Sequence, residues 1–151
     1  MGGATTKQLV SLGANVAIFD VMDVQGKDIE KELGSDRVIF IHVDVTDEKQ
    51  VQNGIEQTVK KFGETLFGCV NCAGVGDPRR VYNPKSGDAH PLKAFERVLA
   101  INVTGTFNVL RLVVQQIMKQ KAPTDGSDQE RGVIINTASI AAYEGQIGQA
   151  R

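Results

Sequence analysis

Apolar, mostly β-branched runs recur along the chain and alternate with polar segments whose apolar residues have helical spacing. The apolar runs predict strands at 15–20, 38–43, 66–71 and 132–139. The helical spacing predicts helices at 4–12, 25–33, 47–62 and 92–119, the last bent near Gly105. Strands that alternate with helices form a parallel sheet covered by those helices. The sequence therefore predicts one α/β domain over residues 1–151.

The last predicted strand indicates where chemistry would take place. It begins at Gly132 and ends at Ser139, and its apolar residues suit a strand that is covered on both faces. In parallel sheets, ligands bind at the carboxyl ends of the strands. Ser139 is therefore the candidate catalytic residue, although a serine needs a proton donor or base within about 3 Å.

Composition and charge exclude several classes of protein. The net charge is −1 with both signs interspersed, which argues against a nucleic-acid partner. No continuous apolar run approaches the roughly 18 residues of a membrane span, and no targeting pattern is visible near Met1. Cys69 and Cys72 lie in an apolar run without a second Cys or His pair, so we expect buried thiols rather than a metal site.

Acidic residues end the first two predicted strands. Asp20 ends the first strand, and Asp44 ends the second, with Val45 after it. In dinucleotide-binding folds, an acid at such a position bonds the ribose hydroxyls and repels a 2′-phosphate. Asp44 is also placed to accept a hydrogen bond from an adenine amino group. The alternative for both acids is a turn or helix-start role, although Asp47 is the better N-cap for the following helix.

Two further segments suggest a cofactor cleft. Small residues end the third strand at Cys72, Ala73 and Gly74, where a flat ligand could approach the backbone closely, although a plain turn would use the same residues. Asn102 lies within the long predicted helix among apolar neighbours. Because asparagine is a poor helix former, a polar function inside the helix is indicated.

The long polar segment 75–91 is predicted to be a loop. Arg79, Arg80 and Lys85 could attract a phosphate or a CoA-type substrate, although a solvated basic loop is the favoured interpretation. Tyr143 follows Ser139 by four residues and is predicted to be a packing residue rather than a proton donor.

Taken together, these motifs resemble the short-chain dehydrogenase/reductase family. The segments that carry the resemblance are Asp20, Asp44-Val45, Asn71 to Gly74, Asn102 to Val109, and Arg131 to Ser139 with the residues that follow to Ala150. The resemblance implies a Rossmann-type, doubly wound parallel sheet. It also implies NAD-dependent oxidation of a 3-hydroxyacyl-CoA, a hydroxysteroid or another alcohol, and a mitochondrial location in fatty acid metabolism.

The resemblance also implies residue roles. The cofactor-binding residues would be Asp20, Asp44, Val45, Cys72, Ala73 and Gly74. Asp20 would select NAD over NADP, Ser139 would bond the substrate oxygen, and Asn102 would help hold a proton-relay water. The helix at 92–119 would form a subunit contact in a homo-oligomer.

Two family features are expected outside this sequence. The family's first strand and glycine-rich phosphate loop would precede Gly2, and its Tyr-x-x-x-Lys would fall just past Arg151. We therefore expect a partial sheet without its first and last strands. We also expect weak NAD binding and little turnover by this chain alone, as for a truncated isoform. The open alternative is a non-catalytic chain that acts through subunit interaction.

Overall fold

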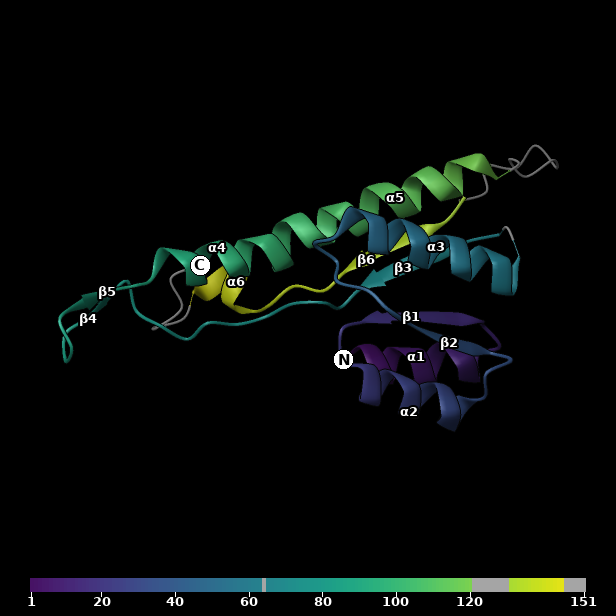
Figure 1. Ribbon diagram of the computed structural model, residues 1–151, viewed down its shortest axis with the longest axis horizontal. Helices are drawn as coiled ribbons and strands as arrows, with labels where there is room; N and C mark the ends of the chain where they lie inside the picture. The colour runs from purple at the N-terminus through teal and green to yellow at the C-terminus, as the bar shows by residue number, and fades with distance from the viewer. Residues whose placement is uncertain (64, 121–130, 146–151) are drawn as a thin grey trace.

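The computed structural model describes residues 1–63, 65–120 and 131–145 (Figure 1). Its helices are α1 (Gly2–Ser11), α2 (Asp23–Leu33), α3 (Glu48–Phe62), α4 (Leu92–Leu99), the π-helical segment η1 (Ala100–Gly105), α5 (Thr106–Lys119) and α6 (Ala141–Glu144). Its strands are β1 (Val16–Asp20), β2 (Val38–His42), β3 (Gly68–Asn71), β4 (Tyr82–Asn83), β5 (Asp88–Ala89) and β6 (Val133–Asn136). Helices and strands alternate as the sequence predicts.

The main strands form two parallel pairs. β1 pairs with β2, from Val16 opposite Val38 to Asp20 opposite His42. β3 pairs with β6 and ends with Asn71 opposite Asn136. All four strands run in the same direction in Figure 1, yet no strand pairing joins β1 to β3 within the described residues. This arrangement confirms a Rossmann-type parallel sheet that is only partly formed.

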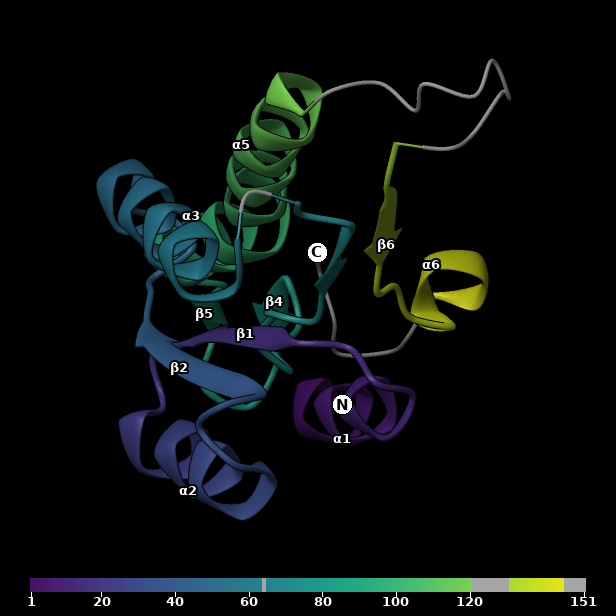
Figure 2. The same cartoon turned by 90° about the vertical axis from the view of Figure 1, so that its right-hand side faces the viewer.

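Helices cover the strand pairs from two sides. Figure 2 shows α3 and α5 on one side of the strands and α1 and α2 on the other. The pairwise contacts agree, because α3 packs on β2, α5 on β3, and α1 and α2 on β1. This two-sided covering is the doubly wound arrangement that the family resemblance implies.

The hydrophobic core joins β2, α3 and α5. Its buried side chains are Ile41, Val43, Val51, Ile55, Val109, Leu112, Val113 and Ile117. On the helices these residues recur at intervals of three or four, which places them on one face. The core therefore holds α3 and α5 against β2.

Two glycines allow aromatic rings to pack against helices. A Cβ atom on Gly26 would lie 2.0 Å from Cδ2 of Phe40, and one on Gly54 would lie 2.7 Å from Cζ of Phe19. Neither helix has space there for a side chain. The rings of β1 and β2 thus fix how closely α2 and α3 approach the strands.

The last strand differs from the prediction. Ile134 packs against the core, but Val133 and Ile135 are 38% and 50% exposed, so the strand is not covered on both faces. Alternate side chains of a strand point to opposite faces, and only one face here meets the core. The strand also ends at Asn136, so Ser139 lies in the connection to α6. The prediction that Tyr143 packs is wrong, because the four-residue α6 leaves its side chain 92% exposed.

Residues 75–91 contain a hairpin that the sequence analysis did not predict. β4 and β5 pair antiparallel, and Gly87 between them has a φ of 76°. The two-residue strands are too short to produce an alternating pattern in a polar segment. We call residues 78–91 the hairpin arm, which projects from the body of the molecule in Figure 1.

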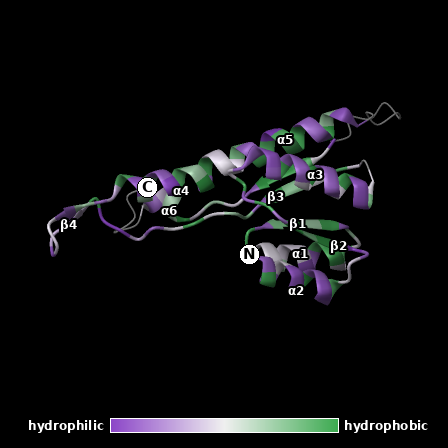
Figure 3. Cartoon of the chain, viewed as in Figure 1, coloured by the Kyte–Doolittle hydropathy of each residue, from purple (hydrophilic) through white to green (hydrophobic). Residues whose placement is uncertain are grey.

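The predicted helix 92–119 is continuous but irregular. η1 separates α4 from α5 and ends at Gly105, where the sequence predicts a bend. By length and composition this 28-residue helix meets the criterion for a membrane span, with a mean hydropathy of 1.4 in its most apolar window. Core helices of soluble proteins meet the same criterion, and α5 packs on α3 and β3. Figure 3 shows hydrophilic residues interspersed along the helix.

Candidate functional site

The predicted site residues lie at the carboxyl ends of the parallel strands. Asp20 is the last residue of β1, and Asp44 follows β2 by two positions. Gly74 follows β3 by three positions and Ser139 follows β6 by three. Because the four strands run in one direction, these residues lie toward one side of the molecule (Figure 1). This is the side on which open α/β sheets bind ligands.

The two acids each use one carboxylate oxygen to fix a turn. Oδ1 of Asp20 accepts from the Met22 amide at 3.0 Å. Oδ1 of Asp44 accepts from the amide and the hydroxyl of Thr46, at 2.9 and 2.7 Å. Within the described part of the chain, no hydrogen bond reaches the second oxygen of either acid. Both acids therefore have the predicted role in a turn, and the second oxygen of each carboxylate is left for a ligand.

Neighbouring groups complete the local electrostatics. His42, opposite Asp20 in the β1–β2 ladder, places Nδ1 at 2.7 Å from Oδ1 of Asp23. Asp47 caps α3 as predicted and accepts from the amides of Lys49 and Gln50. Those hydrogen bonds, led by the one from Gln50, lower the pKa of Asp47. The N-cap of α3 is therefore Asp47 and not Asp44.

The ends of β3 and β6 are fastened to each other. Nδ2 of Asn71 donates to Oδ1 of Asn136 at 2.9 Å, and the Thr137 amide donates to the carbonyl of Asn71 at 3.0 Å. The Thr137 hydroxyl lies 3.5 Å from Sγ of Cys72. These contacts hold the segment that leads to Ser139 beside the segment from Cys72 to Gly74.

Asn102 binds the backbone just beyond Gly74. Its Oδ1 accepts from the Val75 amide and its Nδ2 donates to the Val75 carbonyl, each at 2.9 Å. The predicted polar function inside the helix is thereby identified as a clamp on the cleft-lining segment. Its main-chain carbonyl accepts from the Thr106 hydroxyl at 2.8 Å. The relay-water role of Asn102 stays a prediction.

Ser139 is exposed at the start of the connection to α6. Its Oγ accepts from the Ala141 amide at 3.2 Å, which leaves the hydroxyl hydrogen for another acceptor. It lies three residues beyond the end of β6, whereas the sequence analysis placed it at the last position of the strand. Its role toward a substrate stays a prediction.

The start of α1 is a site feature that the sequence analysis missed. A Cβ atom on Gly2 would lie 3.7 Å from Cβ of Cys72, so the first turn of α1 adjoins the end of β3. A helix N-terminus presents free amides and a positive dipole end, which suits an anion such as a pyrophosphate. The pair Gly2-Gly3 ahead of a helical pattern was the available indication.

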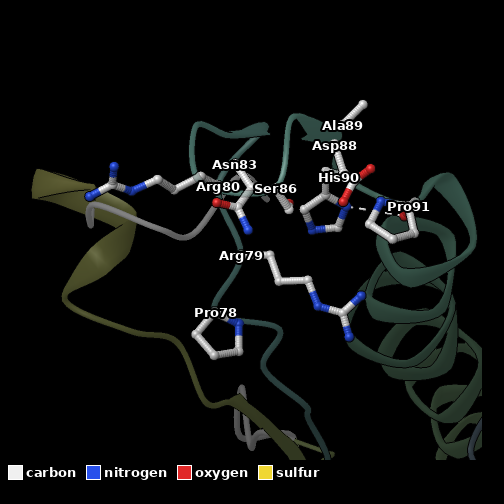
Figure 4. Close-up of a pocket in the computed structure, with 9 residues that line it drawn as sticks. All are labelled: Pro78, Arg79, Arg80, Asn83, Ser86, Asp88, Ala89, His90 and Pro91. Atoms are coloured by element: carbon white, nitrogen blue, oxygen red, sulfur yellow. Dashed lines mark hydrogen bonds between the residues drawn. The ribbon is translucent and has the colours of Figure 1, made fainter.

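The hairpin arm carries a depression of about 390 Å³ (Figure 4). Its lining includes Arg79, Arg80, Asp88 and His90. Arg79 is already paired, since its Nε lies 3.0 Å from Oδ1 of Asp77, a carboxylate that is 9% exposed. The contact is an ion pair without the alignment of a hydrogen bond, because that oxygen has no hydrogen-bond partner in the described structure. Arg80 and Asp88 also line the depression, and His90 has its Nδ1 at 3.1 Å from the Pro91 carbonyl oxygen.

The two thiols are free and half-buried. Burial, together with the nearby Cys72, raises the pKa of Cys69 to about 11, so its thiolate is scarce at neutral pH. Within residues 1–63, 65–120 and 131–145, no group of three His, Cys, Asp or Glu side chains is arranged to hold a metal ion.

Comparison with known proteins identifies the family. The family model for short chain dehydrogenases matches residues 1–151. The chain is 45% identical over 150 residues to 3-hydroxyacyl-CoA dehydrogenase type-2 of Homo sapiens, covering 99% of this chain and 56% of that protein. It is 35% identical over 144 residues to secoisolariciresinol dehydrogenase of Forsythia intermedia, covering 95% of this chain and 47% of that protein.

The fold comparison agrees. The crystal structure of 3-hydroxyacyl-CoA dehydrogenase type-2 from Mycobacterium avium superposes with a TM-score of 0.86 at 35% identity, covering 98% of this chain and 56% of that one. The chain thus spans about half the length of the relatives it matches. By its sequence and its fold, the chain belongs to the short-chain dehydrogenase family.

Proposed function

We propose that this chain contributes the cofactor-binding half of an NAD-dependent dehydrogenase that oxidises a secondary alcohol, with 3-hydroxyacyl-CoA as the substrate class. One observation carries the proposal: Asp20 ends β1 and Asp44 lies two positions beyond the neighbouring parallel strand β2, each with a carboxylate oxygen that the described turns leave open. That arrangement suits the ribose and adenine of a dinucleotide.

The charges around Asp20 favour NAD over NADP. Asp20 would accept from the ribose hydroxyls, and Asp23 starts α2 nearby, so two carboxylates would face a 2′-phosphate. The start of α1 beside Cys72 supports the pyrophosphate position, because its amides and dipole favour an anion. Ala73 and Gly74 would let the cofactor approach the backbone beyond β3.

The alcohol would lie against Ser139. Bound NAD would supply a carbon that accepts hydride from the substrate carbinol carbon, and the hydroxyl proton would pass to water as the alcohol becomes a ketone. The Ser139 hydroxyl would orient the substrate oxygen. Asn102 would act from behind, by holding the Val75 backbone and by helping to hold a water.

The substrate class is supported by two features. The human and Mycobacterium avium relatives are both 3-hydroxyacyl-CoA dehydrogenases of type 2. Arg79 and Arg80 line the depression on the hairpin arm, and their positive charge would attract a phosphate-bearing group, although the Arg80 side chain extends away from His90 in Figure 4. Loss of coenzyme A binding in Arg80→Glu, but not in Lys27→Glu on α2, would support this assignment, and equal binding by both variants would argue for a hydroxysteroid or another alcohol.

NADH binding tests the proposal directly. NADH fluorescence titrated with the wild-type chain, Asp20→Asn and the matched exposed control Asp28→Asn gives three dissociation constants. Hydrogen bonds to a charged group are worth about 1.5–3 kcal/mol, so Asp20→Asn should weaken NADH binding about tenfold and reduce the preference over NADPH. Equal affinity of all three proteins would contradict the cofactor site. Reduction of NAD by a 3-hydroxyacyl-CoA, compared between wild type and Ser139→Ala, tests the chemistry.

A subunit contact is the second candidate role, and a specific surface favours it. The outer face of the helix 92–119 exposes large apolar side chains, which are Leu92, Leu99, Val103, Phe107, Val114 and Met118. They recur at intervals of four or seven, which makes one stripe along the helix. A contiguous exposed apolar stripe is typical of a protein interface. We propose that this stripe contacts a second copy of the chain. From the family resemblance, we also propose that the enzyme is located in the mitochondrion.

A further inference from the structure

The turn that would hold adenine is supported from behind by α5. Asp44 and Val45 follow β2, and the side chain of Asn108 reaches Val45 from the second residue beyond the start of α5. We infer that Asn108 is a positioning residue for the adenine half of the cofactor site, an inference that rests on the proposed NAD site. Asn108 touches neither the base nor the ribose in this role, and acts through the Val45 backbone.

The contacts of Asn108 account for a buried amide in an apolar helix face. Asn108 is 6% exposed, and its Nδ2 donates to the Val45 carbonyl at 2.9 Å. Its Oδ1 accepts from Nη2 of Arg111 at 2.8 Å, and the same Nη2 lies 3.0 Å from Oε1 of Glu48. Arg111 thereby fixes the orientation of the amide, so that its donor and not its acceptor faces Val45.

The same helix also limits the side chain of Val45. A Cβ atom on Gly105 would lie 2.5 Å from Cγ2 of Val45 and 3.2 Å from its Cβ. The helix backbone is therefore in direct contact with Val45. Asn108 holds the carbonyl of this residue while Gly105 borders its side chain, one helical turn apart.

The opposite side of the turn is held by α3. The Asp44 amide donates to Oε1 of Gln50 at 2.9 Å, and Oδ1 of Asp44 accepts from Thr46. Asp44 and Val45 are thus held between two helices that share one core. Because Asp44 would accept from the adenine amino group, a shift of Val45 moves the acceptor that distinguishes adenine from other bases.

The preference for adenine over hypoxanthine distinguishes a positioning role of Asn108 from a merely structural one. Adenosine and inosine 5′-monophosphates share the ribose and phosphate and differ at the group that Asp44 would bond. General loosening of the fold weakens both nucleotides equally, whereas misplacement of Asp44 weakens only the adenine nucleotide. The readout is therefore a ratio, the dissociation constant for inosine 5′-monophosphate divided by that for adenosine 5′-monophosphate.

The experiment titrates both nucleotides into the isotope-labelled full chain and follows them by NMR. Asn108→Asp keeps the side-chain shape and the acceptor for Arg111 but removes the donor to Val45. The ratio should fall roughly fivefold in Asn108→Asp, as in Asp44→Asn, since a lost hydrogen bond is worth about 1 kcal/mol. Asn53→Asp is the control, because it makes the same exchange at an exposed position of α3 and should leave the ratio within about twofold.

The outcomes are distinct. A wild-type chain that binds both nucleotides equally would overturn the proposed adenine site together with this inference. Discrimination that persists unchanged in Asn108→Asp would overturn the inference alone.

A substitution at Gly105 in the same helix supplies an independent test of the inference, which can still be carried out if Asn108→Asp does not fold. Gly105→Ala should reduce discrimination by displacing Val45, because the added methyl group would lie 2.5 Å from Cγ2 of Val45. Discrimination unaffected by Gly105→Ala would contradict the inference.

Discussion

Asn102 holds Val75 by both of its polar backbone groups, with the amide donating to Oδ1 and the carbonyl accepting from Nδ2 at 2.9 Å each. The contact joins a π-helical segment to the connection that leaves β3, across 27 positions in the chain. It therefore fixes the cleft-lining residues Cys72 to Gly74 relative to the long helix.

Replacement of Asn102 by Asp should destabilise the chain. The carboxylate still accepts from the Val75 amide but cannot donate to the Val75 carbonyl, and a half-buried acceptor left without its donor costs about 1–3 kcal/mol. Urea unfolding of the variant measures the loss. Asn83→Asp on the hairpin arm is the control, because its Oδ1 only accepts from the Lys85 amide and keeps that bond. Equal stability of the two variants would show that the clamp contributes little.

Gly26 should not tolerate alanine. A methyl group there would lie 2.0 Å from Cδ2 of Phe40, and overpacking of this kind costs about 1–3 kcal/mol. Gly2→Ala is the matched control, since its Cβ would make an ordinary contact of 3.7 Å. We expect a lower melting temperature for Gly26→Ala only. An unchanged melting temperature would mean that α2 is free to move away from β2.

The Asp47 cap of α3 should make the stability of the folded chain depend on pH in the acidic range. The pKa of Asp47 is lowered from 3.8, chiefly by the amide of Gln50, so its carboxylate is preferred in the folded state. A lowered folded pKa contributes stability above the unfolded pKa that is lost as the pH falls through the folded pKa. Asp47→Asn retains a capping oxygen but cannot titrate. Its melting temperature should therefore fall less than that of wild type below pH 4. Parallel pH profiles would refute a contribution from Asp47.

Cys69 should resist alkylation. Because burial raises its pKa from 9.0 to about 11, its thiolate fraction at pH 8 is reduced about a hundredfold. Mass spectrometry of the Cys72→Ser variant after iodoacetamide treatment reports on Cys69 alone. Slow labelling in buffer and rapid labelling in urea are expected. Rapid labelling of the native chain at pH 8 would show that the third strand opens readily.

The exposed stripe on the long helix should control self-association. Phe107 is 62% exposed near the middle of the stripe, and a glutamate there would place a charge within the proposed contact. Light scattering should show a dimer or larger species for wild type and a lower mass for Phe107→Glu. Val24→Glu is the control, because Val24 is 70% exposed on α2. Equal masses of the two variants would exclude the stripe as the contact.

Much of the fold could be predicted from local patterns. The strand runs and helical spacing predicted α3 with its cap at Asp47, and the order of strands and helices. The arm hairpin could not be predicted, because two-residue strands form no periodic pattern. The exposure of Tyr143 depends on how short α6 is, and α6 ends at Gly145, whose φ of 66° is a helix stop that the sequence analysis did not use.

The sequence by itself determined the alternation of strands and helices, with Asp20 at the end of β1 and Asp44 and Ser139 two and three positions beyond β2 and β6, because periodicity and side-chain chemistry are local properties. Only the tertiary structure decided what surrounds these residues. Asn102 meets Val75 and Asn108 meets Val45 across 27 and 63 positions, and such partners follow from the packing of helices on strands rather than from neighbouring residues.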